Sequence, residues 1–362
     1  MPNSASSPSQ PSPAEQLARD ISSLQSDVSF LHSQVLLSST RDAIEDLETL
    51  VRGLPQRVHA IRTRKYAFGK DLENHSQDLN RRWPAVRSSV QSQIEIQASQ
   101  LNQGISQVEL QMNRLVGMRS NVALGRQNLP RVQSEVANLK SKVSAAESSL
   151  RGMYDAFEDE IRAFVDQVGK VEWTMGQVDE ACFSLTPTEA PVMAVKAVWY
   201  QDQREEKEDP DGVLYLTDQR LIFEQKEEIA TKKVLFITTE RQKVQKLLFE
   251  VPLASIQEIK GSKQGLFHNE DHIEMNCGAG APFTWAKLHI FDQDCNEWAG
   301  MVHKARSGEF DHERAIPVDQ AAAEKVKDVP TICPNCGGNL DQKILRGMDS
   351  ISCAYCGTVI RI

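Results

Sequence analysis

Apolar residues recur through the first half of the chain at spacings that alternate between three and four residues. The clearest run is Leu129, Val132, Val136, Leu139, Val143, Ala146, Leu150, Met153, Phe157, Ile161, Phe164, Val168, Val171, Met175 and Val178. Shorter runs cover residues 17–35, 44–61 and 101–115. Because the alternation averages about 3.5 residues, these side chains fall along one seam of a helix, as in coiled coils. The pattern predicts an α-helical coiled-coil region over residues 14–185.

Three prolines, Pro55, Pro84 and Pro130, interrupt this region. Proline lacks an amide donor and its ring clashes with the preceding turn, so each is expected to kink or end a helix. The predicted helices therefore cover about 14–53, 56–83, 85–127 and 130–183. Antiparallel hairpins and one kinked rod bury the same seam, so the pattern fits both. The Ser- and Pro-rich residues 1–13 predict a disordered tail.

Beyond residue 187 the pattern changes from a helical period to alternation, which is typical of short strands. Candidate strands cover residues 194–200, 213–216, 220–223, 234–237, 246–251, 256–259, 272–275 and 284–290. Asp294 can cap a closing helix whose apolar face is Trp298, Met301 and Val302. Residues 187–308 are thus predicted to form a β-rich sandwich or barrel with a C-terminal helix.

Two motifs in this segment resemble a known family. Residues 212–223 read GVLYLTDQRLIF, which is similar to the G-x-L-Y-L-T-x-x-R-L-x-F core of GRAM and related pleckstrin-like (PH-like) domains. Residues 251–259 read VPLASIQEI, which resembles the V-P-L-x-x-I-x-x-I strand of that class. The resemblance covers roughly residues 187–308 and implies a PH-like barrel that binds lipid or protein. A charged insertion over residues 224–246 separates the two motifs.

Two CxxC pairs stand near the C-terminus with the spacing C-x2-C-x16-C-x2-C. They are Cys333, Cys336, Cys353 and Cys356. Each pair aims two thiolates at one point, and four thiolates complete a tetrahedron around zinc. The spacing predicts a zinc ribbon over residues 331–362 with one structural Zn²⁺, joined to the β-rich domain by a linker over residues 309–330. An iron–sulfur site and a redox dithiol are the weaker alternatives.

The formal net charge of −9 gives the chain no global attraction to nucleic acid or anionic lipid. Basic residues could still form a rim for anionic lipid headgroups. They are Lys232, Lys233, Arg241, Lys243, Lys246, Lys260 and Lys263. Interspersed glutamates make a mixed solvated surface the simpler interpretation. The basic residues of the ribbon are Lys343, Arg346 and Arg361, too few to favour nucleic acid as a partner.

The first residues lack a basic and then apolar leader, and no run reaches the roughly 18 apolar residues that span a membrane. A cytoplasmic protein is expected. No phosphate-binding loop, nucleophile elbow or paired-carboxylate motif occurs, so neither an enzyme nor a small-molecule substrate is predicted. The main hypothesis is a non-enzymatic adaptor or scaffold that self-associates or binds proteins through its coiled coil and docks through its PH-like domain and ribbon. The alternatives are a peripheral membrane protein that binds anionic lipid through the PH-like domain, and a nucleic-acid-associated regulator that acts through the ribbon.

Overall fold

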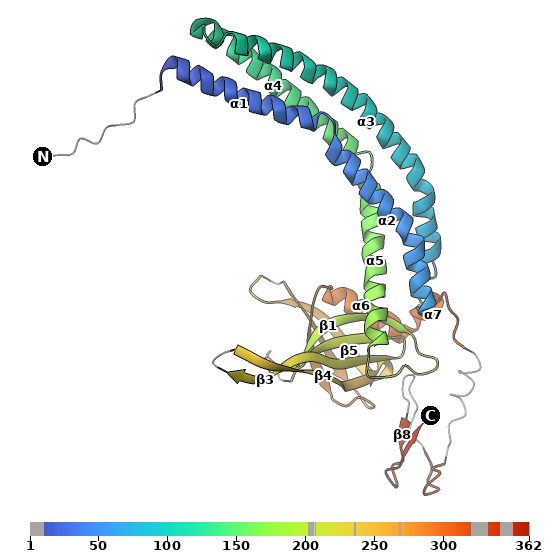
Figure 1. Ribbon diagram of the computed structural model, residues 1–362. Coiled ribbons are helices and arrows are strands. Elements are labelled where there is room, and N and C mark those ends of the chain that lie inside the picture. The colour runs from blue at the N-terminus through green and yellow to red at the C-terminus, as the bar shows by residue number, and fades with distance from the viewer. Residues whose placement is uncertain are drawn as a thin grey trace, which may run out of the picture. The chain divides into compact units, whose positions relative to one another are not determined.

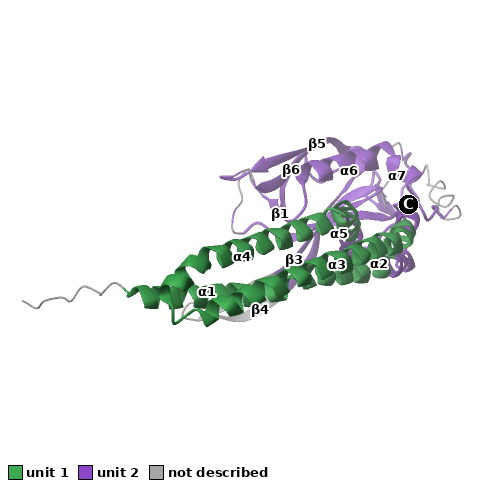
Figure 2. Cartoon of the chain, turned by 90° about the horizontal axis from the view of Figure 1, so that it is seen from above, with its two compact units in different colours: residues 1–54, 76–165 green, residues 55–75, 166–362 purple. Residues whose placement is uncertain are grey.

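The computed structural model describes residues 11–201, 206, 208–234, 237–267, 269–319, 332–340 and 350–361. The chain forms two compact units, coloured separately in Figure 2. The helical unit comprises residues 1–54 and 76–165, and the sheet unit comprises residues 55–75 and 166–362. Most of the predicted tail and the second half of the predicted linker lie outside the described residues.

The first half of the chain is helical, as the apolar spacing predicts. Its helices are α1 (Pro13–Gln34), α2 (Ser38–Thr63), α3 (Leu72–Gly117), α4 (Val122–Arg151) and α5 (Asp155–Asp179) (Figure 1). Most of the predicted seam is buried, from Leu17 in α1 to Met175 in α5. Helix α1 begins with a capping box, in which Ser12 Oγ accepts the Glu15 amide at 3.3 Å and the Glu15 carboxylate accepts the Ser12 amide at 2.7 Å.

The helix ends predicted at the three prolines are wrong. Pro55, Pro84 and Pro130 lie inside α2, α3 and α4, respectively. Proline in a helix interior costs about 3 kcal/mol. Each buried leucine or valine of the seam contributes about 1.5–3 kcal/mol, and buried residues such as Leu54 and Val58 stand on both sides of Pro55. Burial of the seam therefore outweighs the lost hydrogen bond and carries each helix through its proline.

Within the helical unit, helices fold back beside one another, which is one of the two arrangements that the sequence left open. Two glycines record how closely they approach. A Cβ on Gly125 of α4 would lie 2.6 Å from Leu17 Cδ2 of α1, and a Cβ on Gly104 of α3 would lie 2.9 Å from Leu139 Cδ1 of α4. Both distances are shorter than carbon atoms tolerate, so these positions accept only glycine without repacking.

The sheet unit contains a seven-stranded antiparallel sheet with the strand order β4-β3-β2-β1-β7-β6-β5. Its strands are β1 (Pro191–Tyr200), β2 (Asp211–Thr217), β3 (Arg220–Val234), β4 (Ile237–Pro252), β5 (Ile256–Gln264), β6 (Glu270–Cys277) and β7 (Trp285–Ile290). No separate strand covers residues 234–237 as expected: Val234 ends β3, Ile237 begins β4 and the two residues pair, while residues 235 and 236 lie outside the described residues. The described residues of the charged insertion, 224–234 and 237–246, thus extend β3 and β4 as one long antiparallel pair.

Residues 166–183 pack on the sheet, which the sequence did not predict. Trp173 and Val178 of α5, with Phe183 after it, contact a buried cluster that includes Ala194 of β1 and Tyr215 of β2. Side chains on this face of the sheet are therefore covered by the end of the helical segment. Thr174 Oγ1 also accepts the Ala194 amide at 2.9 Å, so a buried backbone donor of β1 is satisfied by α5.

The connection between α2 and α3 is organised by one arginine. The Arg62 guanidinium donates to the carbonyl oxygens of Tyr66 at 2.8 Å, Phe68 at 2.6 Å and Gly69 at 2.6 Å. It also pairs with Glu73 in the first turn of α3 at 2.6 Å. The planar guanidinium group has five N–H donors, which suits a turn whose carbonyl groups lack partners within a helix.

The sheet is closed by helix α6 (Cys295–Ser307), as predicted, with Asp294 as its N-cap. Trp298 and Val302 of α6 are fully buried. The short helix α7 (Glu309–His312) follows, and its Phe310 is also buried. The first residues of the predicted linker therefore belong to the folded sheet unit, because Phe310 packs on Phe68 with ring centroids 5.4 Å apart.

Candidate functional site

The four predicted zinc ligands lie together. The sulfur atoms of Cys333, Cys336, Cys353 and Cys356 are all within 4.8 Å of one another. The Cys333–Cys356 and Cys336–Cys353 sulfur pairs are each 3.6 Å apart. A disulfide would need about 2.05 Å between sulfur atoms. Sulfur atoms on a tetrahedron of radius about 2.3 Å lie roughly 3.8 Å apart, so this cluster fits zinc and not two cystines.

Both CxxC pairs have the same local geometry. The Gly337 amide donates to the Cys333 carbonyl at 2.9 Å, and the Gly357 amide donates to the Cys353 carbonyl at 2.9 Å. Gly337 has φ +70° and Gly357 has φ +71°, in the left-handed region that glycine enters at little cost. The chain thus turns twice in the same way and brings both thiols of each pair to one point.

The electrostatics of the cluster also favour a cation. The Thr358 hydroxyl and backbone amide lower the pKa of Cys356 to about 6. Although the Gly338 amide favours the Cys336 thiolate, the neighbouring Cys356 and burial raise the pKa of Cys336 to about 12. Ionisation of one thiol thus disfavours ionisation of its neighbour, because the two negative charges repel each other. A divalent cation would offset that repulsion. Four protein ligands leave no open coordination position, which suits a structural ion.

The cysteines are held by a small apolar core. Cys333 and Cys353 are buried with Ile351 of β8 (Ser350–Ser352) and Ile360 of β9 (Val359–Arg361). These two strands pair antiparallel. Arg361 is exposed on β9, whereas Lys343 and Arg346 lie outside the described residues. A core of this size offers little burial, so bound metal would supply much of the stability.

Four of the basic residues predicted to form a lipid-binding rim lie on the two edge strands of the sheet. Lys243 and Lys246 are exposed on β4, one edge strand, and Lys260 and Lys263 are on β5, the other. Lys260 pairs with Glu258 at 2.7 Å. Lys263 pairs with Asp271 at 2.6 Å and with Asp294 at 2.9 Å. The side chains of Lys232, Lys233 and Arg241 lie outside the described residues, and the rim stays a prediction.

The arginine of the motif GVLYLTDQRLIF, Arg220, is buried, and its charge is paired inside the protein. Arg220 Nε and Nη2 donate to the two carboxylate oxygens of Glu189, each at 2.9 Å, and Nη2 also donates to the Ser184 carbonyl at 2.7 Å. Glu250 of β4 is a further partner. The hydroxyl of Thr217, the last residue of β2, donates to Glu189 at 2.6 Å and accepts the Arg220 amide at 2.9 Å. These motif residues hold the β2–β3 corner together through buried contacts.

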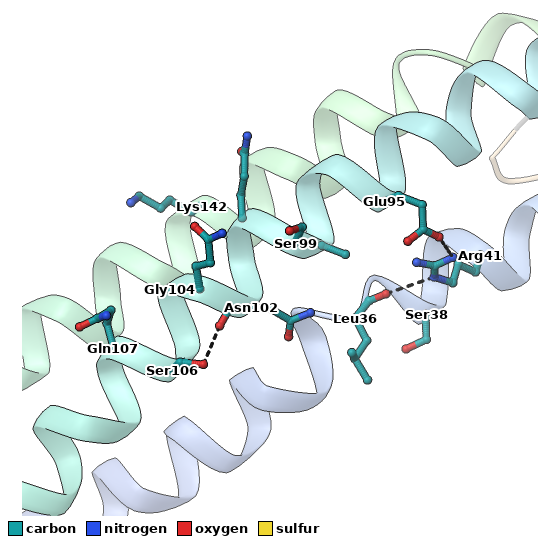
Figure 3. A pocket seen from close by; sticks show the side chains of 13 residues that line it. Leu36, Ser38, Arg41, Glu95, Ser99, Asn102, Gly104, Ser106, Gln107 and Lys142 are labelled. Atoms are coloured by element: carbon teal, nitrogen blue, oxygen red, sulfur yellow. Dashed lines mark hydrogen bonds and ion pairs between the residues drawn. The ribbon is translucent and has the colours of Figure 1, made fainter.

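A groove of about 1270 Å³ opens in the helical unit beside the junction of α1 and α2 (Figure 3). Leu36 lines it and is 49% exposed. Arg41 crosses its edge, donating to Glu95 of α3 at 2.9 Å and to the Leu36 carbonyl at 3.4 Å. The remaining lining is rich in amides and hydroxyls from α3, including Ser99, Asn102, Gln103, Ser106 and Gln107.

A second groove of about 350 Å³ runs between α1 and α4 in the same unit. Phe30 stands at this groove and is 62% exposed. Sequence reasoning missed both grooves, because the larger one arises where α1 ends and not at a proline, and the smaller one depends on how α1 and α4 lie beside each other. The run Ser38-Ser39-Thr40 is a helix-start signal that marks this junction.

No protein-family model matches the sequence, and no curated protein matches it. Among solved structures, the Vps36 N-terminal PH domain is similar at 13% identity, covering 35% of this chain and 85% of that one with a TM-score of 0.24. The structure of human RhoA in complex with the DH/PH fragment of PDZRHOGEF is similar at 11% identity, covering 82% and 94% with a TM-score of 0.24. The DH/PH domains of p115-RhoGEF match at 11% identity, covering 82% and 95% with a TM-score of 0.22.

Among the described residues, none of the helices combines the length and the apolar character that crossing a bilayer requires.

Proposed function

We propose that the protein is a non-enzymatic adaptor that binds a helix along its helical unit, either from a second copy of itself or from a partner protein. The pair of grooves beside α1 carries this proposal. Phe30 and Leu36 are large apolar side chains at the two grooves, and both are substantially exposed. Exposed apolar side chains at a groove between helices are typical of a helix-in-groove contact.

The chemistry of the larger groove suits a helix with a mixed face. Its hydroxyl and amide groups can pair with polar side chains of an incoming helix, and Leu36 offers an apolar anchor. Arg41 and Glu95 neutralise each other, which leaves Lys142 as the cationic group of the lining. The seam spacing, which is that of coiled coils, supports a partner of the same kind.

The other two modules supply docking and rigidity in this proposal. The GVLYLTDQRLIF motif, the antiparallel sheet and the closing helix α6 support a PH-like domain of the GRAM type, which would present a docking face. The four-cysteine cluster supports a zinc ribbon in which the metal is structural. Both modules fit a cytoplasmic protein whose partners are proteins.

Self-association is tested by light scattering coupled to size-exclusion chromatography on the full chain. The double variant F30E/L36E places charge at both grooves and is expected to reduce the measured mass towards that of one chain. L124E is the matched control, because Leu124 is 41% exposed on α4 and lines neither groove. A wild-type mass that F30E/L36E does not change would reject self-association through these grooves.

The partner-protein form is tested by a photo-crosslinking amino acid placed at position 36 and, as control, at position 124. We expect a crosslinked protein species from position 36 that F30E reduces. Equal crosslinking from both positions would show that the groove has no selective occupant and would remove the basis of the adaptor proposal.

A further inference from the structure

We propose that the tip of the β5–β6 hairpin is a membrane-insertion wedge that enters the apolar surface of a lipid bilayer. The wedge consists of Leu266 and Phe267, which are 96% and 85% exposed. They are adjacent in the chain, and both are more exposed than any other large apolar residue that the structure describes. The wedge is distinct from the grooves of the helical unit, so this inference does not depend on the adaptor function.

The wedge stands on a firmly held hairpin. Gln264 of β5 pairs with Glu270 of β6 as the last pair of the ladder. Gly265 then turns the chain with φ +83°, and a Cβ there would lie 2.7 Å from the Glu270 carboxylate. The Gln264 side chain accepts a hydrogen bond from Lys287 Nζ at 3.0 Å. Backbone and side-chain contacts thus fix the end of the ladder next to which the apolar pair is exposed.

The base of the hairpin is also tied to helix α6. Lys263 pairs with Asp271 across the ladder and with Asp294, the N-cap of α6. Asp271 in turn accepts the Cys295 amide at 2.9 Å. The strands that carry the wedge are therefore ordered before binding, so little conformational entropy of this support is lost when the wedge binds.

A bilayer is the occupant that this geometry and charge favour. The two side chains are almost fully exposed at the end of a hairpin, and a bilayer accepts an exposed apolar tip without requiring a complementary pocket. Acidic groups outnumber basic ones at the base of the hairpin, since Lys260 pairs with Glu258 whereas Lys263 pairs with both Asp271 and Asp294. Attraction to anionic lipid is therefore not needed, and zwitterionic lipid should bind at least as well. In this respect the wedge differs from the predicted lysine rim, whose binding would require anionic lipid and would weaken with salt.

The test is flotation of the full-length, zinc-supplemented protein with vesicles of phosphatidylcholine alone and of phosphatidylcholine with phosphatidylserine, at low and physiological salt. Two inserted side chains give weak, reversible binding, so lipid is kept in large excess. The wild type is expected to float with both vesicle types at both salt concentrations. L266S/F267S should weaken partitioning by roughly a hundredfold, because each buried side chain of this size contributes about tenfold or more.

Two matched variants separate insertion from other causes. F30S removes an exposed phenylalanine of the helical unit and should leave flotation unchanged. K243E/K246E removes two lysines of the predicted rim and should also leave it unchanged. F267W should retain binding and gain tryptophan quenching by brominated lipid beyond that of the wild type, which reports depth and not mere contact.

Three outcomes would overturn the inference. The first is that the wild type does not float with either vesicle type, as expected if the tip docks into a protein. The second is that L266S/F267S floats as well as the wild type. The third is that flotation requires anionic lipid and is lost in K243E/K246E, which would show that the predicted lysine rim, and not the wedge, binds the membrane.

Discussion

Replacing Arg220 with methionine should destabilise the sheet unit strongly. The Arg220 side chain is 3% exposed and its partner Glu189 is fully buried. Methionine keeps much of the apolar volume but leaves the Glu189 carboxylate without its bidentate donor. Removing one member of a buried ion pair costs about 3–5 kcal/mol, most of it the penalty of an uncompensated buried charge. R220M should therefore lower the free energy of unfolding of the sheet unit by about that amount.

The effect is measured by hydrogen exchange and mass spectrometry on peptides from β2 and β3 across a urea series, because a chain with two units does not unfold in one step. The control is K260M, which removes an exposed pair with Glu258 and should have a much smaller effect, because solvent screens that pair. The double variant E189Q/R220M removes the stranded charge and should recover about 1–3 kcal/mol of the loss. If R220M costs no more than K260M, the assignment of Arg220 as the structural core of this corner is refuted.

Three further changes test other parts of the molecule. C353S, or chelation of the wild type, should remove about one bound zinc per chain and open the ribbon while the helical circular dichroism stays constant, as measured by metal analysis and spectroscopy. Burial, followed by the charge of His289, lowers the pKa of His272; the neutral form is the one that folds, so stability should fall as the pH drops below about 6.5, and H272F should remove that component from urea midpoints measured across pH. G125V should lower the unfolding free energy of the helical unit by about 1–3 kcal/mol in thermal melts, because the added atoms would meet Leu17.

The helices could be predicted from the sequence more securely than their ends. The apolar seam is a local, periodic property, and burial follows it closely. The ends depend on whether burial of apolar side chains outweighs a lost backbone hydrogen bond, and the apolar period alone does not tell which effect is larger. Pro130 loses a hydrogen bond inside α4, yet Leu129 and Val132 beside it are both buried. The actual ends coincide with capping residues, such as Asn121, whose side chain accepts the Leu124 amide at 3.2 Å before α4.

Most strands of the sheet unit were also predictable, but the long pairing of β3 with β4 and the segments that complete this unit were not. Residues 55–75 and 166–183 carry helical patterns, and nothing in those patterns says that Trp173 packs beside Tyr215. That contact joins residues far apart in the chain, and it depends on side-chain shape. The same holds for Arg220, whose place in a family-like motif suggested a ligand-binding domain but whose geometry shows a buried support.

The cysteine cluster and the hairpin tip mark the two extremes of what a sequence specifies. The positions of Cys333 and Cys356 relative to one another follow from ligand chemistry, since two CxxC turns with glycine after each second cysteine can converge on one ion whatever surrounds them. Leu266 and Phe267 read in the sequence like core residues. They are exposed because Gly265 turns the chain before they can join the ladder and because the ion pairs of Lys263 fix the hairpin below them. The hydrophobicity of Leu266 and Phe267 can be read from the sequence, whereas their exposure depends on the turn at Gly265. An apolar pair that its own turn keeps out of the core is therefore a candidate binding surface that sequence patterns do not reveal.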